Sequence, residues 1–230
     1  MLPIQNTIFT PNAPTGKDVG EGKEARLKTG TTTVGIICKD CVILAADKRA
    51  TAGNLIADKH TKKVQPVTAH IAVTTAGSVS DLQLLHKYLV AELKIKAMRT
   101  DGKEATVGEA ANLLSGWTYH LARSSWGVVH WLVGGYDTAP RLFDVYADGS
   151  IMMQEEFVTS GSGSVFALGV LENRYKKGLA REEGIKLVVQ AVNAALARDS
   201  GSGNGIDVFV IDKDGWKQVL AKEVLSTVEN

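Results

Sequence analysis

The stretch KTGTTTVGI, residues 28–36, lies between a polar leader and the first strand-like pattern of the chain. Thr and Val favour strands and Gly favours irregular backbone, so a flexible connection into a β-strand is one interpretation. A second interpretation is chemical. A threonine at a chain terminus carries its own base, the α-amine, which can activate the hydroxyl as a nucleophile. Cleavage after Gly30 would create such a terminus at Thr31.

The composition indicates an ordinary globular chain. Its 230 residues, 44% hydrophobic and 22% charged, suffice for one domain with a large core. With 26 basic against 25 acidic side chains, the net charge of +1 disfavours nucleic acid and anionic membranes as partners. No apolar run approaches the ~18 residues of a membrane span, and residues 1–30 lack the apolar centre of a secretion signal. We expect a soluble protein with a loosely ordered leader.

The two cysteines form a CxxC pattern, Cys38 to Cys41. A zinc site needs a second pair of ligands, and the five histidines offer no tight pair. A thioredoxin-type motif opens a helix after a strand, whereas this pattern lies between two strand-like runs. We interpret both cysteines as small side chains flanking a hairpin turn, and a disulfide between them remains open. We expect neither a metal nor a cofactor.

The hydrophobic pattern predicts an α+β fold. Strands are expected at 31–38, 41–47, 64–67, 70–76, 128–134, 141–146, 151–153, 206–211 and 217–220. Helices are expected at 80–98, from 106 to include Leu121, at 165–177 and at 182–198. The first two strands are apolar on both faces, and no βαβ alternation occurs. These features predict a four-layer α-β-β-α sandwich of two antiparallel sheets.

Common catalytic motifs are missing from the sequence. It contains no HExxH, GxxxxGK[ST] or GxSxG pattern, which disfavours zincins, P-loop proteins and hydrolases with a nucleophile elbow. The run SGSGS at 160–164 precedes a helix and could bind an anion, but a turn or hydroxyl-rich wall is the simpler interpretation. A terminal α-amine titrates near pH ~7.7 to 8.0, so a threonine nucleophile remains workable.

The segment GTTTVGI at 30–36, followed by Asp47 and Lys63, resembles the catalytic β subunit of the 20S proteasome, most closely the archaeal type. The resemblance continues through AGSVSD at 76–81, GGYD at 134–137, SGSGS at 160–164 and RDSGSG at 198–203, and covers nearly everything from Thr31 onward. It implies the N-terminal nucleophile hydrolase fold. Residues 1–30 would be a propeptide and residues 31–230 a single catalytic domain.

The resemblance also implies residue roles. Thr31 would be the nucleophile, exposed by autocatalytic cleavage between Gly30 and Thr31. Lys63 would place a positive charge beside the hydroxyl, Asp47 would pair with Lys63, and the Gly77 N–H would form the oxyanion hole. Three further residues would hydrogen-bond the terminal amine: Ser162, Asp199 and Ser202.

The same resemblance suggests how a substrate binds. Thr51 matches a position that binds the substrate backbone, and the primary specificity pocket would comprise Ala50, Thr61, Gln65, Thr75, Val79 and Gln83. This uncharged set predicts cleavage after hydrophobic or neutral residues. Alternatively, the same side chains fill strand and helix surfaces.

The expected working unit is a barrel in the cytoplasm, with heptameric rings of this β subunit between rings of α subunits. An ATP-dependent unfoldase would supply unfolded proteins or peptides. Two alternatives stay open: a catalytically silent structural β subunit, and a small-substrate amidohydrolase of the same superfamily. The sequence does not decide whether other β subunits share the ring, whether the leader is retained, or when processing occurs relative to assembly.

Overall fold

The computed structural model describes residues 30–124 and 127–223, so the predicted propeptide, apart from Gly30, lies outside the described residues. Ten of the strands form two antiparallel five-stranded sheets, and a separate hairpin adds two more. The first sheet, in the order β10-β1-β2-β11-β12, contains β10 Phe157–Ser160, β1 Thr33–Ile37, β2 Val42–Asp47, β11 Gly205–Asp212 and β12 Gly215–Glu223. The second, in sequence order, contains β5 Val64–Pro66, β6 Ile71–Gly77, β7 Val129–Tyr136, β8 Pro140–Val145 and β9 Ile151–Gln154.

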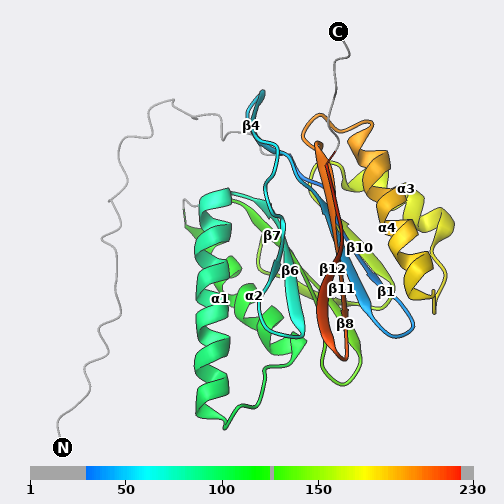
Figure 1. The fold of residues 1–230 in the computed structure, drawn as a ribbon. Helices are drawn as coiled ribbons and strands as arrows, with labels where there is room; N and C mark the ends of the chain where they lie inside the picture. Colours follow the sequence, from blue (N-terminus) through cyan, green and yellow to red (C-terminus); the bar gives the residue numbers. More distant parts are fainter. Residues whose placement is uncertain (1–29, 125–126, 224–230) are drawn as a thin grey trace, which may run out of the picture.

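Two pairs of helices cover the sheets on their outer sides. They are α1 Val79–Arg99, α2 Val107–Arg123, α3 Ser164–Arg174 and α4 Arg181–Leu196. Figure 1 shows α1 and α2 beside the second sheet, and α3 and α4 beside the first. The α2 helix begins with the capping box that the sequence predicts, in which the Thr106 side chain accepts from Glu109 N and the Glu109 carboxylate accepts from Thr106 N.

The helices are amphipathic and bury one side each. In α1 the leucines at helical spacing, Leu85, Leu89 and Leu93, join the core between this helix and the second sheet. In α4, Val188 and Val192 pack with strand residues of the first sheet. The α+β class with two antiparallel sheets is confirmed.

A third apolar core lies between the two sheets. It includes Leu44 and Ile211 from the first sheet and Leu132 and Leu142 from the second, all fully buried. Strand β1 has apolar neighbours on both faces, since Val34 and Ile36 belong to the core under α4 and Ile37 packs against the core between the sheets. The β1 and β2 strands pair in register, with Thr33 opposite Ala46, and this brings the start of one strand beside the end of the other.

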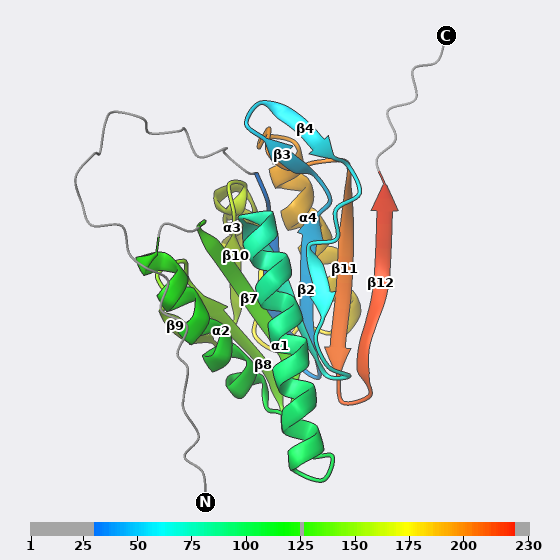
Figure 2. The same ribbon diagram turned by 90° about the vertical axis from the view of Figure 1, so that its left-hand side faces the viewer.

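Three strands differ from the sequence prediction. The hairpin of β3 Ala50–Ala52 and β4 Leu55–Asp58 was not predicted, because its four β4 residues are all exposed and give no buried pattern. Strand β10 was not predicted either, yet it pairs with β1 along the sheet edge. The predicted helix at 165–177 is wrong at its end, since α3 stops at Arg174. In Figure 2 the β3-β4 hairpin projects beyond the ends of β2 and β11.

The cysteines lie where the hairpin interpretation placed them. Cys38 and Cys41 flank the β1-β2 turn, where Cys38 N donates to Cys41 O at 2.8 Å. Both are buried and have free thiols in this structure. Within the described residues, none of the helices is long and apolar enough to cross a membrane.

We predict that Leu142→Ala destabilises the chain by about 2–5 kcal/mol, because it removes a fully buried side chain between the sheets. Leu55→Ala is the matched control: this leucine is 74% exposed, so a change below about 0.5 kcal/mol is expected. Urea unfolding followed by circular dichroism measures both. Equal losses of stability for the two variants would contradict the assigned core.

Candidate active site

A buried ion pair lies where the two sheets open toward the β3-β4 hairpin. Asp47 is the last residue of β2 and Lys63 directly precedes β5. Lys63 Nζ lies 2.7 Å from Asp47 Oδ1, and the side chains are 5% and 0% exposed. Burial lowers the pKa of Lys63, and the negative charge of Asp47 offsets part of this effect. The lysine is therefore a stronger acid here than in water.

The Asp47 carboxylate is surrounded by donors. Its Oδ1 accepts from Thr32 N at 2.9 Å as well as from Lys63 Nζ. Its Oδ2 accepts from Arg49 N and Gly203 N, both at 3.0 Å. All four partners are N–H groups, so an acceptor-only carboxylate matches this environment. One side chain thus joins the start of β1, the residue before β5 and the loop before β11.

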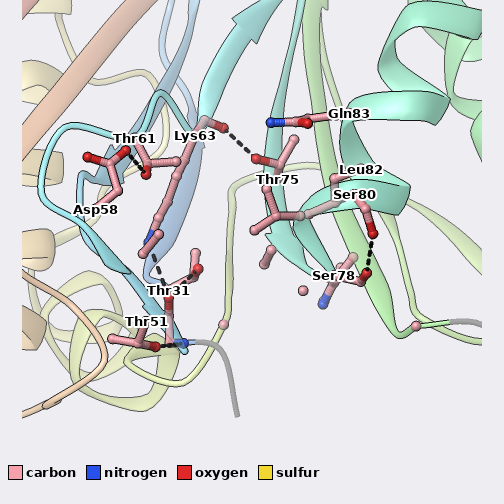
Figure 3. Close-up of a pocket in the computed structure, with 18 of the residues that line it drawn as sticks. Thr31, Thr51, Asp58, Thr61, Lys63, Thr75, Ser78, Ser80, Leu82 and Gln83 are labelled. Atoms are coloured by element: carbon pink, nitrogen blue, oxygen red, sulfur yellow. Dashed lines mark hydrogen bonds between the residues drawn. The ribbon is translucent and has the colours of Figure 1, made fainter. Parts of the chain in front are cut away.

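The Thr31 hydroxyl and the Lys63 ammonium converge on one carbonyl. Thr31 Oγ1 donates to Gly30 O at 2.6 Å, and Lys63 Nζ donates to the same oxygen at 3.2 Å. Figure 3 shows the Lys63 side chain pointing toward Thr31, with Thr51 on the far side of the threonine. The peptide bond between Gly30 and Thr31 therefore lies within reach of a hydroxyl and of a cation.

A hydroxyl and carboxylate network contacts the nitrogen of Thr31. Thr31 N donates to Ser162 Oγ at 3.1 Å, and Ser162 Oγ donates to Asp199 Oδ2 at 2.6 Å. Ser202 Oγ donates to the same carboxylate oxygen at 2.7 Å. The loop after α4, which is the loop that leads into β11, and the loop before α3 therefore meet at this nitrogen. The three residues that the resemblance singled out are together.

Two glycines of the site have no space for a side chain. A Cβ on Gly30 would lie 2.1 Å from Gly201 Cα, so the backbone at residue 30 passes directly against the loop after α4. Gly77 has a φ of +120°, and a Cβ there would lie 2.1 Å from Val128 O. Both close approaches involve backbone atoms, which a substituted side chain can displace only at a large cost in free energy.

A pocket of about 1230 Å³ opens beside Thr31. Its wall contains every residue predicted to contact substrate, namely Ala50, Thr51, Thr61, Gln65, Thr75, Val79 and Gln83, together with Lys63 and Gly77. Figure 3 shows Thr61 and Asp58 on one side of the pocket and Thr75 and Gln83 on the other. The Ser162 network reaches Thr31 N through a hydrogen bond, and Asp47 accepts from Thr32 N; within the described residues neither is part of the pocket lining.

Sequence reasoning missed Arg49, which holds the loop before β11 in place. Its Nε donates to Asn204 Oδ1 at 2.8 Å and one terminal nitrogen donates to Ser200 O at 2.9 Å. Nothing in the hydrophobic pattern signals these contacts, because the partners are distant in the sequence. Among the residues that the structure describes, no cluster of three or more His, Cys, Asp or Glu side chains could hold a metal ion.

Comparisons with known proteins identify the family of the chain. A family model described as "Proteasome subunit" matches residues 27–211. A "Proteasome subunit beta" of Methanocaldococcus jannaschii is 46% identical over 197 residues, which is 85% of this chain and 87% of that protein. A "Proteasome subunit beta" of Methanocaldococcus vulcanius is 44% identical, covering 87% and 90% of the two chains. A "Proteasome subunit beta 2" of Hyperthermus butylicus is 41% identical, covering 90% and 97%.

We predict that Asp47→Asn destabilises the chain although it preserves the side-chain shape. Whichever way the amide is oriented, its NH₂ group meets N–H donors, and the buried Lys63 loses its counter-charge. Breaking a buried pair in this way costs about 3–5 kcal/mol. Urea unfolding measures the loss.

The control for this variant is Asp214→Asn, an exposed carboxylate in the β11-β12 turn, for which a change below about 0.5 kcal/mol is expected. A neutral effect of Asp47→Asn would show that the carboxylate does not hold these segments together.

Proposed function

Because the chain belongs to the proteasome subunit family, we propose that it is a threonine endopeptidase, the proteolytic β subunit of a 20S proteasome. One observation carries the proposal. The Thr31 hydroxyl and Lys63, paired with Asp47, both contact the carbonyl oxygen of residue 30. A nucleophile and a buried cation at one carbonyl are the groups that acyl transfer requires.

The first reaction would be self-cleavage. Thr31 Oγ attacks the Gly30 carbonyl carbon while Lys63 Nζ donates to the carbonyl oxygen, where negative charge develops. The C–N bond then breaks, and the Thr31 nitrogen takes up the proton that the attacking hydroxyl gives up. This leaves an ester between Gly30 and Thr31 Oγ and a free α-amine. Water hydrolyses the ester and releases residues 1–30 as the propeptide.

The mature site would use the new amine as its base. In the uncleaved chain Thr31 N already donates to Ser162 Oγ, which in turn donates to Asp199. This network, with Ser202, would hold the amine beside the hydroxyl and tune its basicity. Lys63 would favour the ionised hydroxyl, and the Gly77 N–H would bind the oxyanion of a substrate.

The Gly30 contacts support the predicted substrate site. Gly30 N donates to Thr51 Oγ1 at 2.8 Å, so the residue proposed to bind substrate backbone already binds the backbone before the cleavable bond. The proposed specificity residues bear no charge, which favours peptide cleavage after hydrophobic or neutral side chains. They are Ala50, Thr61, Gln65, Thr75, Val79 and Gln83.

We also propose the family's assembly for this chain. Residues 31–230 would form one catalytic domain with the four-layer sandwich of N-terminal nucleophile hydrolases. Heptameric β rings would stack with rings of α subunits in the cytoplasm, and an ATP-dependent unfoldase would deliver unfolded proteins. Apolar side chains on α3 support a protein contact there, since Val165 is 65% and Leu168 is 39% exposed.

Thr31→Ala is expected to reduce peptide hydrolysis by at least ~10³-fold, because no other group can form the ester. Wild type and variant are both expressed from residue 31 behind a removable fusion, so that the leader cannot confound the comparison, and both are assembled with α subunits. Thr31→Ser keeps a hydroxyl and is expected to retain activity. A fluorogenic panel with neutral, basic and acidic residues at the cleaved position measures hydrolysis.

Two outcomes of this panel would count against the account. Hydrolysis retained by Thr31→Ala would refute the nucleophile. A preference for an acidic residue at the cleaved position would overturn the interpretation of the specificity pocket but leave the nucleophile intact.

Gly30→Ala is expected to slow self-cleavage by at least about tenfold, because its Cβ would overlap Gly201 and displace the carbonyl from Thr31. Gly116→Ala is the matched control, since a Cβ at this exposed helical position meets nothing within 4 Å. Intact mass over time after assembly measures cleavage. Equal cleavage rates for the two variants would contradict the close approach of Gly30 to Gly201.

A further inference from the structure

Among the ionisable side chains of the pocket that have no role in the proposed mechanism is His130. His130 lies on β7, in the wall of the same pocket as Thr31. It neighbours Ala76 across the sheet, one residue before Gly77. The pocket wall also contains Ser78, Gly127, Val128 and Ala147, whereas the proposed specificity residues come from β3, β5, β6 and α1 and the loop before β5.

His130 is held by a buried carboxylate. Its Nε2 lies 2.6 Å from Asp144 Oδ1 on the neighbouring strand β8. The Asp144 side chain is 1% exposed and the His130 side chain 20% exposed, so the histidine stands between the carboxylate and the pocket. Asp144 Oδ2 is fully buried and has no hydrogen-bond partner among the described residues. A carboxylate buried in this way requires a cation or a strong donor beside it.

Tyr146 fixes the imidazole from another side. Its ring stacks on that of His130 with centroids 5.0 Å apart and an interplanar angle of 30°. The negative charge of Asp144 is the main cause that raises the pKa of Tyr146, followed by burial. With Nε2 bound to Asp144 and one face covered by the tyrosine, Nδ1 is the ring atom left to bind a ligand.

Several other charged residues in and around the pocket have partners of their own. Asp81, on α1, accepts from Gly127 N at 3.1 Å. Lys63 is paired with Asp47, and Asp58 accepts from Thr61 and His60 on the opposite side of the pocket. The strand β6 presents Ala76 beside His130. His130 is therefore a side-chain donor that the pocket wall offers to an anion at this end.

From this geometry we propose that His130 is a specificity-determining residue that binds an acidic side chain of the peptide substrate, and that Asp144 is its positioning residue. The bound carboxylate would lie at a peptide position other than the one whose side chain the neutral specificity residues hold. The imidazole, carrying both protons, would donate Nδ1–H to it while Nε2–H stays on Asp144. This inference rests on the proposed peptidase function.

The test uses the complete assembly with α subunits and a set of internally quenched peptides. Each peptide keeps one neutral cleaved residue, and Glu or Gln is placed in turn at every other position on both sides of the bond. Glu and Gln match in shape, so their kcat/KM ratio reports the charge alone. We expect one position at which Glu exceeds Gln by about five- to tenfold, mainly through KM.

Three variants assign the effect. His130→Gln should bring the ratio to about one, and Asp144→Asn should do the same. His120→Gln, an exposed histidine of α2, should leave the ratio unchanged. Thermal unfolding of each assembly shows whether a variant folds. If Asp144→Asn does not fold, His130→Gln alone still tests the inference.

The outcomes separate this inference from the function on which it rests. Hydrolysis of the Gln peptides by wild type, with no position that distinguishes Glu from Gln, would overturn the inference and leave the peptidase standing. A ratio that survives His130→Gln would overturn it as well. If wild type cleaves none of the peptides, the proposed function itself fails.

Discussion

The site depends on the ion pair between Lys63 and Asp47. Two opposite charges, each at most 5% exposed, are stable in an apolar interior when they meet each other and further hydrogen bonds. Three backbone N–H groups supply these bonds to Asp47, from Thr32, Arg49 and Gly203. The carboxylate therefore orders the lysine and at the same time fixes the backbone on either side of it. The proposed role of Thr31 depends on this arrangement, because Lys63 contacts the Gly30 carbonyl from the position in which Asp47 holds it.

The uncleaved chain already has the arrangement that the mature enzyme would need. The Thr31 nitrogen, still part of a peptide, contacts Ser162, and the preceding residue contacts Thr51. A single conformation thus serves the proposed self-cleavage and the proposed hydrolysis of substrates. Little rearrangement of the surrounding groups would be required between the two reactions, which is how preorganised sites lower a barrier.

Much of the fold could be predicted from local patterns. The leucines of α1 recur at helical spacing, and the strands around Cys38 and Cys41 are apolar on both faces, so their existence follows from the sequence. Strand β4 escaped prediction because its residues are exposed, and β10 because its role comes from pairing with β1. In the site, the resemblance pointed to Thr31, Asp47 and Lys63, and the structure brings them together. Periodicity could not reveal Arg49 or His130, since their partners, Asn204 and Asp144, become neighbours through the folding of the sheets.

The most direct test of the central claim is mass spectrometry of the assembled protein after treatment with an electrophile that reacts with terminal threonines. The account predicts a chain that begins at Thr31 and carries one adduct, located on that residue by peptide mapping. A chain that still contains residues 1–30 after assembly, or an adduct on any other side chain, would contradict it.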